Sequence, residues 1–213
     1  MRNLIATLLT LAASSAAANP FPNWAEQKFA LFSSNDYTTT ETAVDVQSAG
    51  TVSMLWTALP PSDWLTRKAS WDWSVTKSVP PTDLTQKGGD DRNLSLYFVF
   101  MPEEIARENQ SASIRTLLAV EDARVLMYVF GGNHQIGDVL PSPYLGDRGR
   151  TIIQRAAGTG DFTETVDLAA DYTRAFGSEA TALVGLALSA DSDDTDSRIA
   201  ARLENLQLDS SLD

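Results

Sequence analysis

The run Asp191-Ser192-Asp193-Asp194-Thr195-Asp196 carries four carboxylates in six residues, and such oxygens bind hard cations like Ca²⁺. It is not an EF-hand loop. Such a loop needs glycine at its sixth position and glutamate at its twelfth, where this chain has Asp196 and Arg202. Since aspartate favours turns, we interpret the run as a solvated turn between two strands. The alternative is a structural calcium site with the ligands Asp191, Asp193, Asp194 and Asp196, and no other cofactor is expected.

A second group of charged residues, Asp90, Asp91 and Arg92, follows two glycines and precedes the most apolar segment of the chain. An exposed turn in which Arg92 pairs locally explains this group. The functional alternative is a rim of carboxylate and guanidinium groups at the mouth of a β-sandwich, where ligand-binding loops gather. Asp90, Asp91 and Arg92, together with Arg155, are therefore candidate ligand-binding residues.

Trp71 and Trp73 are two residues apart, so both indoles project from one face of an expected strand. A tryptophan pair on a sheet can stack against sugar rings, which makes both residues candidates for ligand binding. Ser70, Asp72 and Ser74 take the other face of the strand. This clean alternation favours the other interpretation, in which the two tryptophans belong to the hydrophobic core.

Nucleophilic catalysis finds little support in the sequence. The chain has no cysteine and no Gly-x-Ser-x-Gly motif, and a Ser-His-Asp triad would have to use the single histidine, His134. We interpret His134, which follows a glycine pair, as an exposed loop residue. A zinc centre takes several histidine or cysteine ligands and is not expected. Paired carboxylates of the glycosidase kind have no sequence signature and stay open.

Short strands must position these residues, because apolar and polar residues alternate between clusters of Gly, Pro, Asn and Asp. In the strongest segment, Leu94, Leu96, Phe98 and Phe100 share one face. The expected strands are Phe29–Ser33, Thr38–Val46, Thr51–Thr57, Ala69–Thr76, Leu94–Met101, Arg124–Phe130, Thr151–Ala156, Thr181–Ser189 and Arg198–Leu208. This pattern predicts a mainly β fold, an antiparallel two-sheet β-sandwich with one or two short helical insertions.

Two helical segments interrupt the strands. Pro102-Glu103-Glu104 is typical of a helix start, and pieces of helix are expected up to about Val120. A second helix is predicted from Leu168 to Phe176. Asp167 can cap its first turn, and Gly177 can end it in a left-handed conformation.

Residues 1–18 have the parts of a secretory signal peptide: Arg2, an apolar stretch at 4–13, and small residues at Ala16 and Ala18. We expect cleavage after Ala18 and a periplasmic or secreted product. The apolar stretch is shorter than the ~20 residues that span a membrane. The remaining residues, 19–213, are enough for a single domain.

The chain is acidic, with a net charge of −12. A field of this sign repels phosphate backbones and anionic headgroups. We therefore expect neither nucleic acid as a partner nor membrane insertion after signal cleavage. The absence of cysteine excludes disulfides, so the fold must depend on its hydrophobic core.

Several landmarks follow one another in a characteristic order. They are Trp71-Asp72-Trp73, Gly89-Asp90-Asp91, the strand 96–100, Met127-Tyr128-Val129-Phe130-Gly131, the helix 167–177 and Asp191-Ser192-Asp193-Asp194-Thr195. In this order they resemble DUF3047, a family of domains of unknown function, over about residues 29–208. The resemblance implies an exported β-sandwich of jelly-roll type, similar in outline to carbohydrate-binding folds, and implies no established activity.

The functional hypothesis from the sequence is a non-catalytic ligand-binding β-sandwich, with carbohydrate or envelope glycan as the ligand class. Two alternatives stay open. One is a polysaccharide hydrolase or lyase that uses paired carboxylates, and the other is a structural or assembly protein of the envelope. Turnover of a labelled polysaccharide distinguishes the first alternative, and binding to sugars distinguishes the second.

Overall fold

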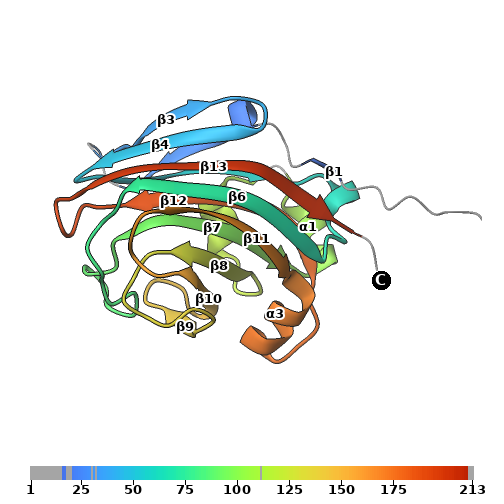
Figure 1. Cartoon of the computed structure of the whole chain (residues 1–213). Helices are drawn as coiled ribbons and strands as arrows, with labels where there is room; N and C mark the ends of the chain where they lie inside the picture. The colour runs from blue at the N-terminus through green and yellow to red at the C-terminus, as the bar shows by residue number, and fades with distance from the viewer. Residues whose placement is uncertain (1–15, 18–20, 30, 32, 111, 211–213) are drawn as a thin grey trace, which may run out of the picture.

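The computed structural model describes residues 16–17, 21–29, 31, 33–110 and 112–210. Its strands form two sheets that stack as the layers of a β-sandwich (Figure 1). The predicted fold class is therefore confirmed. The predicted signal peptide, residues 1–18, lies outside the described residues except for Ala16–Ala17, which form the short strand β1.

The first sheet has the order β11-β6-β13-β4-β3, and β1 pairs with β13 beside this path. Its strands are β11 (Gly160–Asp167), β6 (Lys68–Lys77), β13 (Arg198–Asp209), β4 (Ala43–Ala49), β3 (Asp36–Thr39) and β1 (Ala16–Ala17). All of these described strands pair antiparallel. We call this layer the five-stranded sheet after its main path.

The second sheet has seven strands in the order β2-β5-β12-β7-β8-β10-β9. They are β2 (Ala25–Lys28), β5 (Val52–Ala58), β12 (Ala182–Asp191), β7 (Arg92–Met101), β8 (Arg124–Phe130), β10 (Gly146–Arg155) and β9 (Val139–Ser142). Within the described residues, β8 and β10 run parallel and the other neighbours run antiparallel. The centre of this sheet, β12-β7-β8, consists almost entirely of buried residues.

Aromatic side chains fill the space between the two sheets. Trp71 and Trp73 of β6 are both buried, and their rings meet edge to face at 5.5 Å. Trp71 packs on Tyr128 at 5.5 Å and Trp73 on Phe130 at 5.7 Å, while Phe98 meets Tyr128 edge to face at 5.5 Å. Such offset and edge-on contacts add to the hydrophobic burial that holds the layers together.

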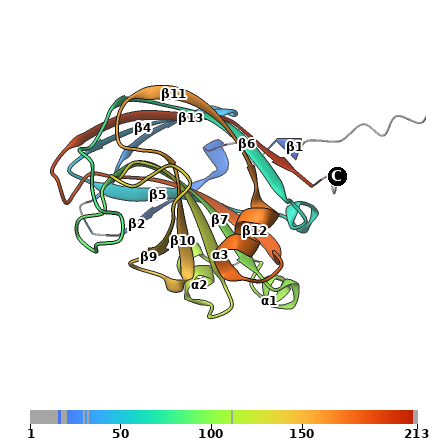
Figure 2. The same cartoon turned by 60° about the horizontal axis from the view of Figure 1, so that its bottom comes forward.

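The described residues form three short α-helices, two of them in succession between β7 and β8 and one after β11, and two single 3₁₀ turns at Phe21–Asn23 and Pro61–Asp63. The helices are α1 (Glu103–Glu108), α2 (Ile114–Ala119) and α3 (Leu168–Phe176), and α1 and α3 lie at the same end of the sandwich (Figure 1, Figure 2). In α3, the Asp167 side chain accepts a hydrogen bond from Ala170 N, and Gly177 ends the helix at φ 74°. No helix of the described residues is long and apolar enough to cross a membrane.

The structure differs from the predicted strands at several points, and β10 begins at Gly146 rather than at the expected Thr151. The expected strand Thr38–Val46 is a hairpin, because the chain turns between β3 and β4. The expected strand Phe29–Ser33 is wrong, since β2 ends at Lys28, and residues 30 and 32 lie outside the described ones. β9 and β11 were not expected, because both are edge strands with few apolar residues, and their periodicity is weak.

Candidate functional site

The face of the seven-stranded sheet that points away from the aromatic core contains a cavity of about 390 Å³. Its floor is formed by residues of β5, β12, β7, β8 and β10, and its walls by loops and by Leu118 of α2. Most of the lining is apolar, and a few polar side chains converge on one side. The volume and the lining match small-molecule sites, which span ~300–1,000 Å³.

A β-bulge in β7 brings Arg92 to this cavity. Ser95 pairs with Ser189 of β12 while Arg92 pairs with Asp191, so three steps along β7 match two along β12. Strict alternation would place Arg92 on the same face as Leu94, inside the sandwich. The extra residue instead turns Arg92 to the cavity side and places it opposite Asp191.

Arg92 is the centre of a buried polar network. Its Nη1 donates to Asp90 Oδ2 at 3.0 Å and to Asp191 Oδ2 at 3.1 Å. Its Nη2 donates to the Tyr97 hydroxyl at 3.1 Å, and that hydroxyl lies 3.0 Å from Ser189 Oγ. The Arg92 side chain is only 13% exposed, so these contacts replace most of its hydration.

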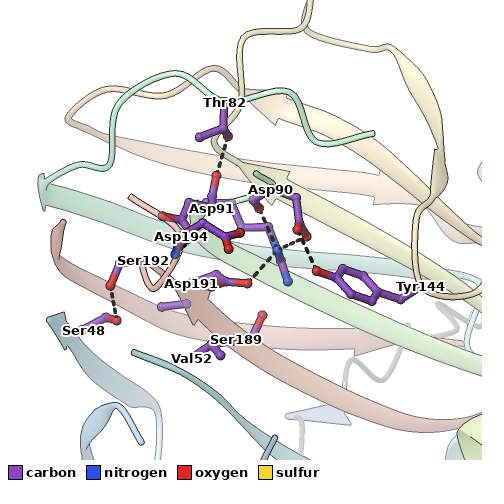
Figure 3. A network of polar contacts seen from close by, with 12 residues as sticks. Ser48, Val52, Thr82, Asp90, Asp91, Tyr144, Ser189, Asp191, Ser192 and Asp194 are labelled. Carbon is purple, nitrogen blue, oxygen red and sulfur yellow. Dashed lines mark hydrogen bonds and ion pairs between the residues drawn. The ribbon is translucent and has the colours of Figure 1, made fainter. Parts of the chain in front are cut away.

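Tyr144 closes one side of the cavity from the loop after β9. Its hydroxyl donates to Asp90 Oδ1 at 2.8 Å (Figure 3). Asp90 is therefore held by both Tyr144 and Arg92. Burial, and then the neighbouring Asp90 carboxylate, raise the pKa of the Tyr144 hydroxyl. The Lys87 ammonium lies over the Tyr144 ring at 5.1 Å from its centroid. The rim of the cavity therefore combines an aromatic face with charged groups of both signs.

Asp91 lies behind this wall and ties it to the loop after β12. Its Oδ1 accepts from Asp194 N at 3.2 Å, and its Oδ2 accepts from Thr195 N at 2.8 Å and from the Thr195 hydroxyl. Its backbone carbonyl accepts from Thr82 Oγ1 at 2.6 Å (Figure 3). Asp91 is fully buried, so it positions the acidic loop rather than facing the cavity.

Two buried polar atoms in the cavity lining have no hydrogen-bond partner among the described residues: Ser95 Oγ and Asp191 Oδ1. Ser95 is 1% exposed and Asp191 is 7% exposed. Leaving a buried polar atom unpaired costs about 1–3 kcal/mol, so folds rarely retain one without a use. Both atoms are therefore available to a bound ligand.

The carboxylates around Asp191 are crowded. Burial raises the pKa of Asp191 to about 8, because lost hydration and the nearby Asp193 outweigh the opposing effect of Arg92. Burial and then the charges of Asp193 and Asp91 raise the pKa of Asp194 as well. A like charge nearby disfavours ionisation, so this wall favours either a proton or another positive charge.

The structure brings together six of the residues singled out from the sequence. They are Asp90, Asp91, Arg92, Asp191, Asp193 and Asp194, and all except Asp91 line the cavity. The exposed-turn interpretation of residues 90–92 is wrong, because Asp90 and Asp91 are buried and Arg92 reaches across to Asp191. The solvated-turn interpretation holds for residues 193–196, which are exposed apart from their contacts to Asp91, but not for Asp191.

Other predicted residues lie away from the cavity. Trp71 and Trp73 are buried between the sheets. Arg155 pairs through two hydrogen bonds with Glu164, at 2.9 and 3.1 Å, and its guanidinium stacks on Phe162. Asp196 is exposed at the tip of its loop, outside the cavity lining.

His134 is not an exposed loop residue. Its Nε2 accepts a hydrogen bond from Leu84 N at 3.1 Å and lies 3.3 Å from Asp83 Oδ1, with its side chain 18% exposed. At Gly132, two residues before it, a Cβ atom would clash with the Leu84 side chain. His134 therefore holds two loops together.

Most lining residues were not singled out from the sequence, among them Ser95, Tyr97, Met127 and Tyr144. The sequence does contain a sign of Ser95 and Tyr97. Both place a polar group on the face of the strand opposite Leu94, Leu96 and Phe98, in a segment that is otherwise apolar. The sequence contains no such sign of Tyr144, because a loop residue does not belong to a periodic pattern from which its direction could be predicted.

The sequence matches the family described as a protein of unknown function, DUF3047, over residues 22–207. The chain belongs to this family. No curated protein matches it. Among solved structures, it is similar to the xyloglucanase domain of NopAA, a type three effector from Sinorhizobium fredii in complex with cellobiose. The match has a TM-score of 0.46 and 9% sequence identity, and covers 87% of this chain and 92% of that one. The predicted DUF3047 membership is thus confirmed.

Proposed function

We propose that this domain binds a neutral, hydroxyl-rich ligand, a carbohydrate or envelope glycan, in the cavity on the outer face of the seven-stranded sheet. The observation that carries the proposal is the pair of unpartnered buried atoms, Ser95 Oγ and Asp191 Oδ1, in the lining of that cavity. A ligand that hydrogen-bonds to both would recover the cost of leaving them unpaired.

The other polar groups of the lining support the same class of ligand. Carboxylates accept hydrogen bonds and guanidinium groups donate them, while a sugar hydroxyl does both. Asp90, Arg92 and Asp191 offer acceptors and donors side by side on one wall. The Tyr144 ring supplies an apolar surface next to them, which suits the C–H faces of a sugar ring.

The wall is also rigid before any ligand arrives. Arg92 is fixed by three side chains, and Asp90 is held by Arg92 and Tyr144. A site whose side chains are already ordered loses less conformational entropy on binding. The arrangement thus favours selective binding of a small ligand over contact with a large flat surface.

Calorimetric titration with a panel of neutral oligosaccharides tests the proposal. Tyr144→Phe removes only the hydroxyl that holds Asp90 in the cavity wall, and is expected to weaken binding about tenfold, or ~1.4 kcal/mol. Tyr144→Ala removes the ring as well and should weaken binding further.

Tyr37→Phe is the matched control, because its hydroxyl bonds to Ser53 O outside the cavity lining. Its affinity should equal that of the wild type. Absence of binding to every sugar in the panel, or equal affinity in all three variants, would contradict the proposal.

The same samples separate the hydrolase or lyase alternative, which needs a pair of carboxylates facing the substrate. Asp90, Asp191 and Asp193 lie on one wall of the cavity and could supply such a pair. New reducing ends released from a labelled polysaccharide would identify catalysis. Binding without turnover would leave the binding module as the function.

Export to the periplasm or exterior is part of the proposal. It is supported by the charge, apolar stretch and small residues of residues 1–18. Intact-mass measurement on periplasmic or secreted protein should give a chain that begins at Asn19. A soluble product that retains residues 1–18 would contradict it.

A further inference from the structure

Three carboxylates from two distant parts of the chain converge beside the cavity. One oxygen each from Asp91, Asp191 and Asp193 lie within 4.8 Å of one another. Asp91 precedes β7 and the other two belong to the end of β12 and the loop after it. Figure 3 shows Asp91 and Asp191 on neighbouring segments, with Asp194 beside Asp91.

The charges of this region do not balance. Asp90, Asp91 and Asp191 are all buried, and within the described ion pairs Arg92 is the single cation that contacts any of them. Asp193 adds another carboxylate from the exposed side. Buried charges are costly unless paired, so a surplus of carboxylates calls for a positive charge in their midst.

An independent observation points to the same place. Asp191 is 7% exposed, and its Oδ1 has no hydrogen-bond partner among the described residues, although its Oδ2 is bound by Arg92. Asp193 brings a second carboxylate within 4.8 Å of Asp191, so two acceptor groups lie side by side. Two carboxylates this close repel one another unless a proton or a cation lies between them.

We infer that Asp91, Asp191 and Asp193 bind a divalent cation with a preference for oxygen ligands, and that this cation is Ca²⁺. The inference does not depend on glycan binding. A cation here would take up Asp191 Oδ1 and leave Ser95 Oγ as the unpartnered atom that faces the cavity.

The geometry suits calcium. Two ligands at ~2.4 Å from one ion lie up to about 4.8 Å apart, which accommodates the observed separations. Calcium takes six to eight oxygens in flexible geometry, so water can complete its shell on the exposed Asp193 side. Mg²⁺ demands a near-ideal octahedron at shorter distances and is a poorer fit to ligands fixed by the fold.

This ligand set differs from the one suggested by the sequence run. Asp91 enters it from a position 100 residues before Asp191 and already anchors the acidic loop through Thr195 N. Asp196 does not belong to it, since its carboxylate points to Gly50 instead. The cation would thus join the start of β7 to the end of β12.

Thermal unfolding in calcium tests the inference, on protein first stripped with a chelator and without any sugar. Calcium at about one hundred times its Kd is expected to raise Tm by about 5–10 °C, while magnesium at matched ionic strength should give much less. Titration calorimetry with CaCl₂ should give one site per chain.

Asp193→Asn removes one ligand charge from an exposed position, so the variant should fold, and its calcium-dependent rise in Tm should disappear. Asp196→Asn is the matched control, because it removes the same charge from the same loop, and Asn tolerates the left-handed φ of 47° found there. It should keep the full rise.

Three results would overturn the inference: no calcium-specific rise in the wild type, an equal rise with magnesium, or an equal rise in Asp193→Asn. The first result would assign the positive charge to a proton shared by Asp191 and Asp193. Because no sugar is present, failure here would leave glycan binding intact, and failure to bind glycans would leave the cation site intact.

Discussion

On its inner face, β7 presents Leu96, Phe98 and Phe100 to the other sheet, where each is fully buried among apolar side chains. On its outer face the same strand presents Ser95 and Tyr97 to the cavity, next to Arg92 at the bulge. The inner face pairs apolar groups in well-packed contacts. The outer face keeps polar groups buried and leaves some of them without partners.

The difference separates stability from function within one sheet. Apolar burial contributes about 25 cal/mol per Å² and needs no partner of fixed geometry, so the inner face stabilises the fold. The polar outer face contributes little net free energy and includes atoms that cost stability. Local violations of good packing of this kind are expected at functional sites.

The largest expected effect lies on the inner face. Phe98→Ala empties a fully buried ring site that contacts Tyr128 at 5.5 Å, and should lower the free energy of unfolding by about 3–5 kcal/mol. Chemical denaturation measures it. Leu65→Ala, at a position 63% exposed, is the control and should change stability little. A midpoint for Phe98→Ala close to wild type would show that the inner face does not carry the stability.

A comparable loss is expected where the outer face depends on a buried charge. Arg92→Met leaves Asp90 and Asp191 without their cation and should cost about 3 kcal/mol in denaturation. Arg202→Met removes an arginine that also pairs with two acids, but on the surface, and should cost ~0–1 kcal/mol. Equal costs in the two variants would mean that burial does not distinguish the Arg92 network.

The smallest effect is also the most diagnostic. Ser95→Ala removes a buried hydroxyl that has no partner, so stability should stay equal or rise by up to about 1 kcal/mol. Ser53→Ala is the matched control, because that buried hydroxyl accepts from Asn35 N at 2.9 Å, and its loss should cost about 1–2 kcal/mol. If Ser95→Ala is as destabilising as Ser53→Ala, the hydroxyl has a structural role and the cavity wall has been misinterpreted.

Ser95→Ala also tests stability and ligand binding in the same variant. A variant that is no less stable but binds sugars more weakly would show that the hydroxyl is retained for the ligand. Unchanged affinity would exclude Ser95 from the ligand contacts.

Local features of this protein could be predicted from the sequence. The strand Arg124–Phe130 and the helix Leu168–Phe176 were predicted with the bounds that the structure has, and Asp167 and Gly177 cap that helix as expected. These features depend on residues within a few positions of one another, so periodicity and capping rules suffice. The two-sheet fold followed from the same local patterns taken together.

The candidate site was decided by the tertiary structure. Asp91 and Thr195 are 104 residues apart, and Arg92 and Asp191 are 99 apart, so their contacts depend on which strands become neighbours. The bulge that turns Arg92 outward is a matter of register between β7 and β12, which no single strand encodes. For the same reason the sequence could name the acids of the site but not which of them face one another. Register and strand order arise from packing over the whole chain, and only that packing places Asp91 beside Asp191.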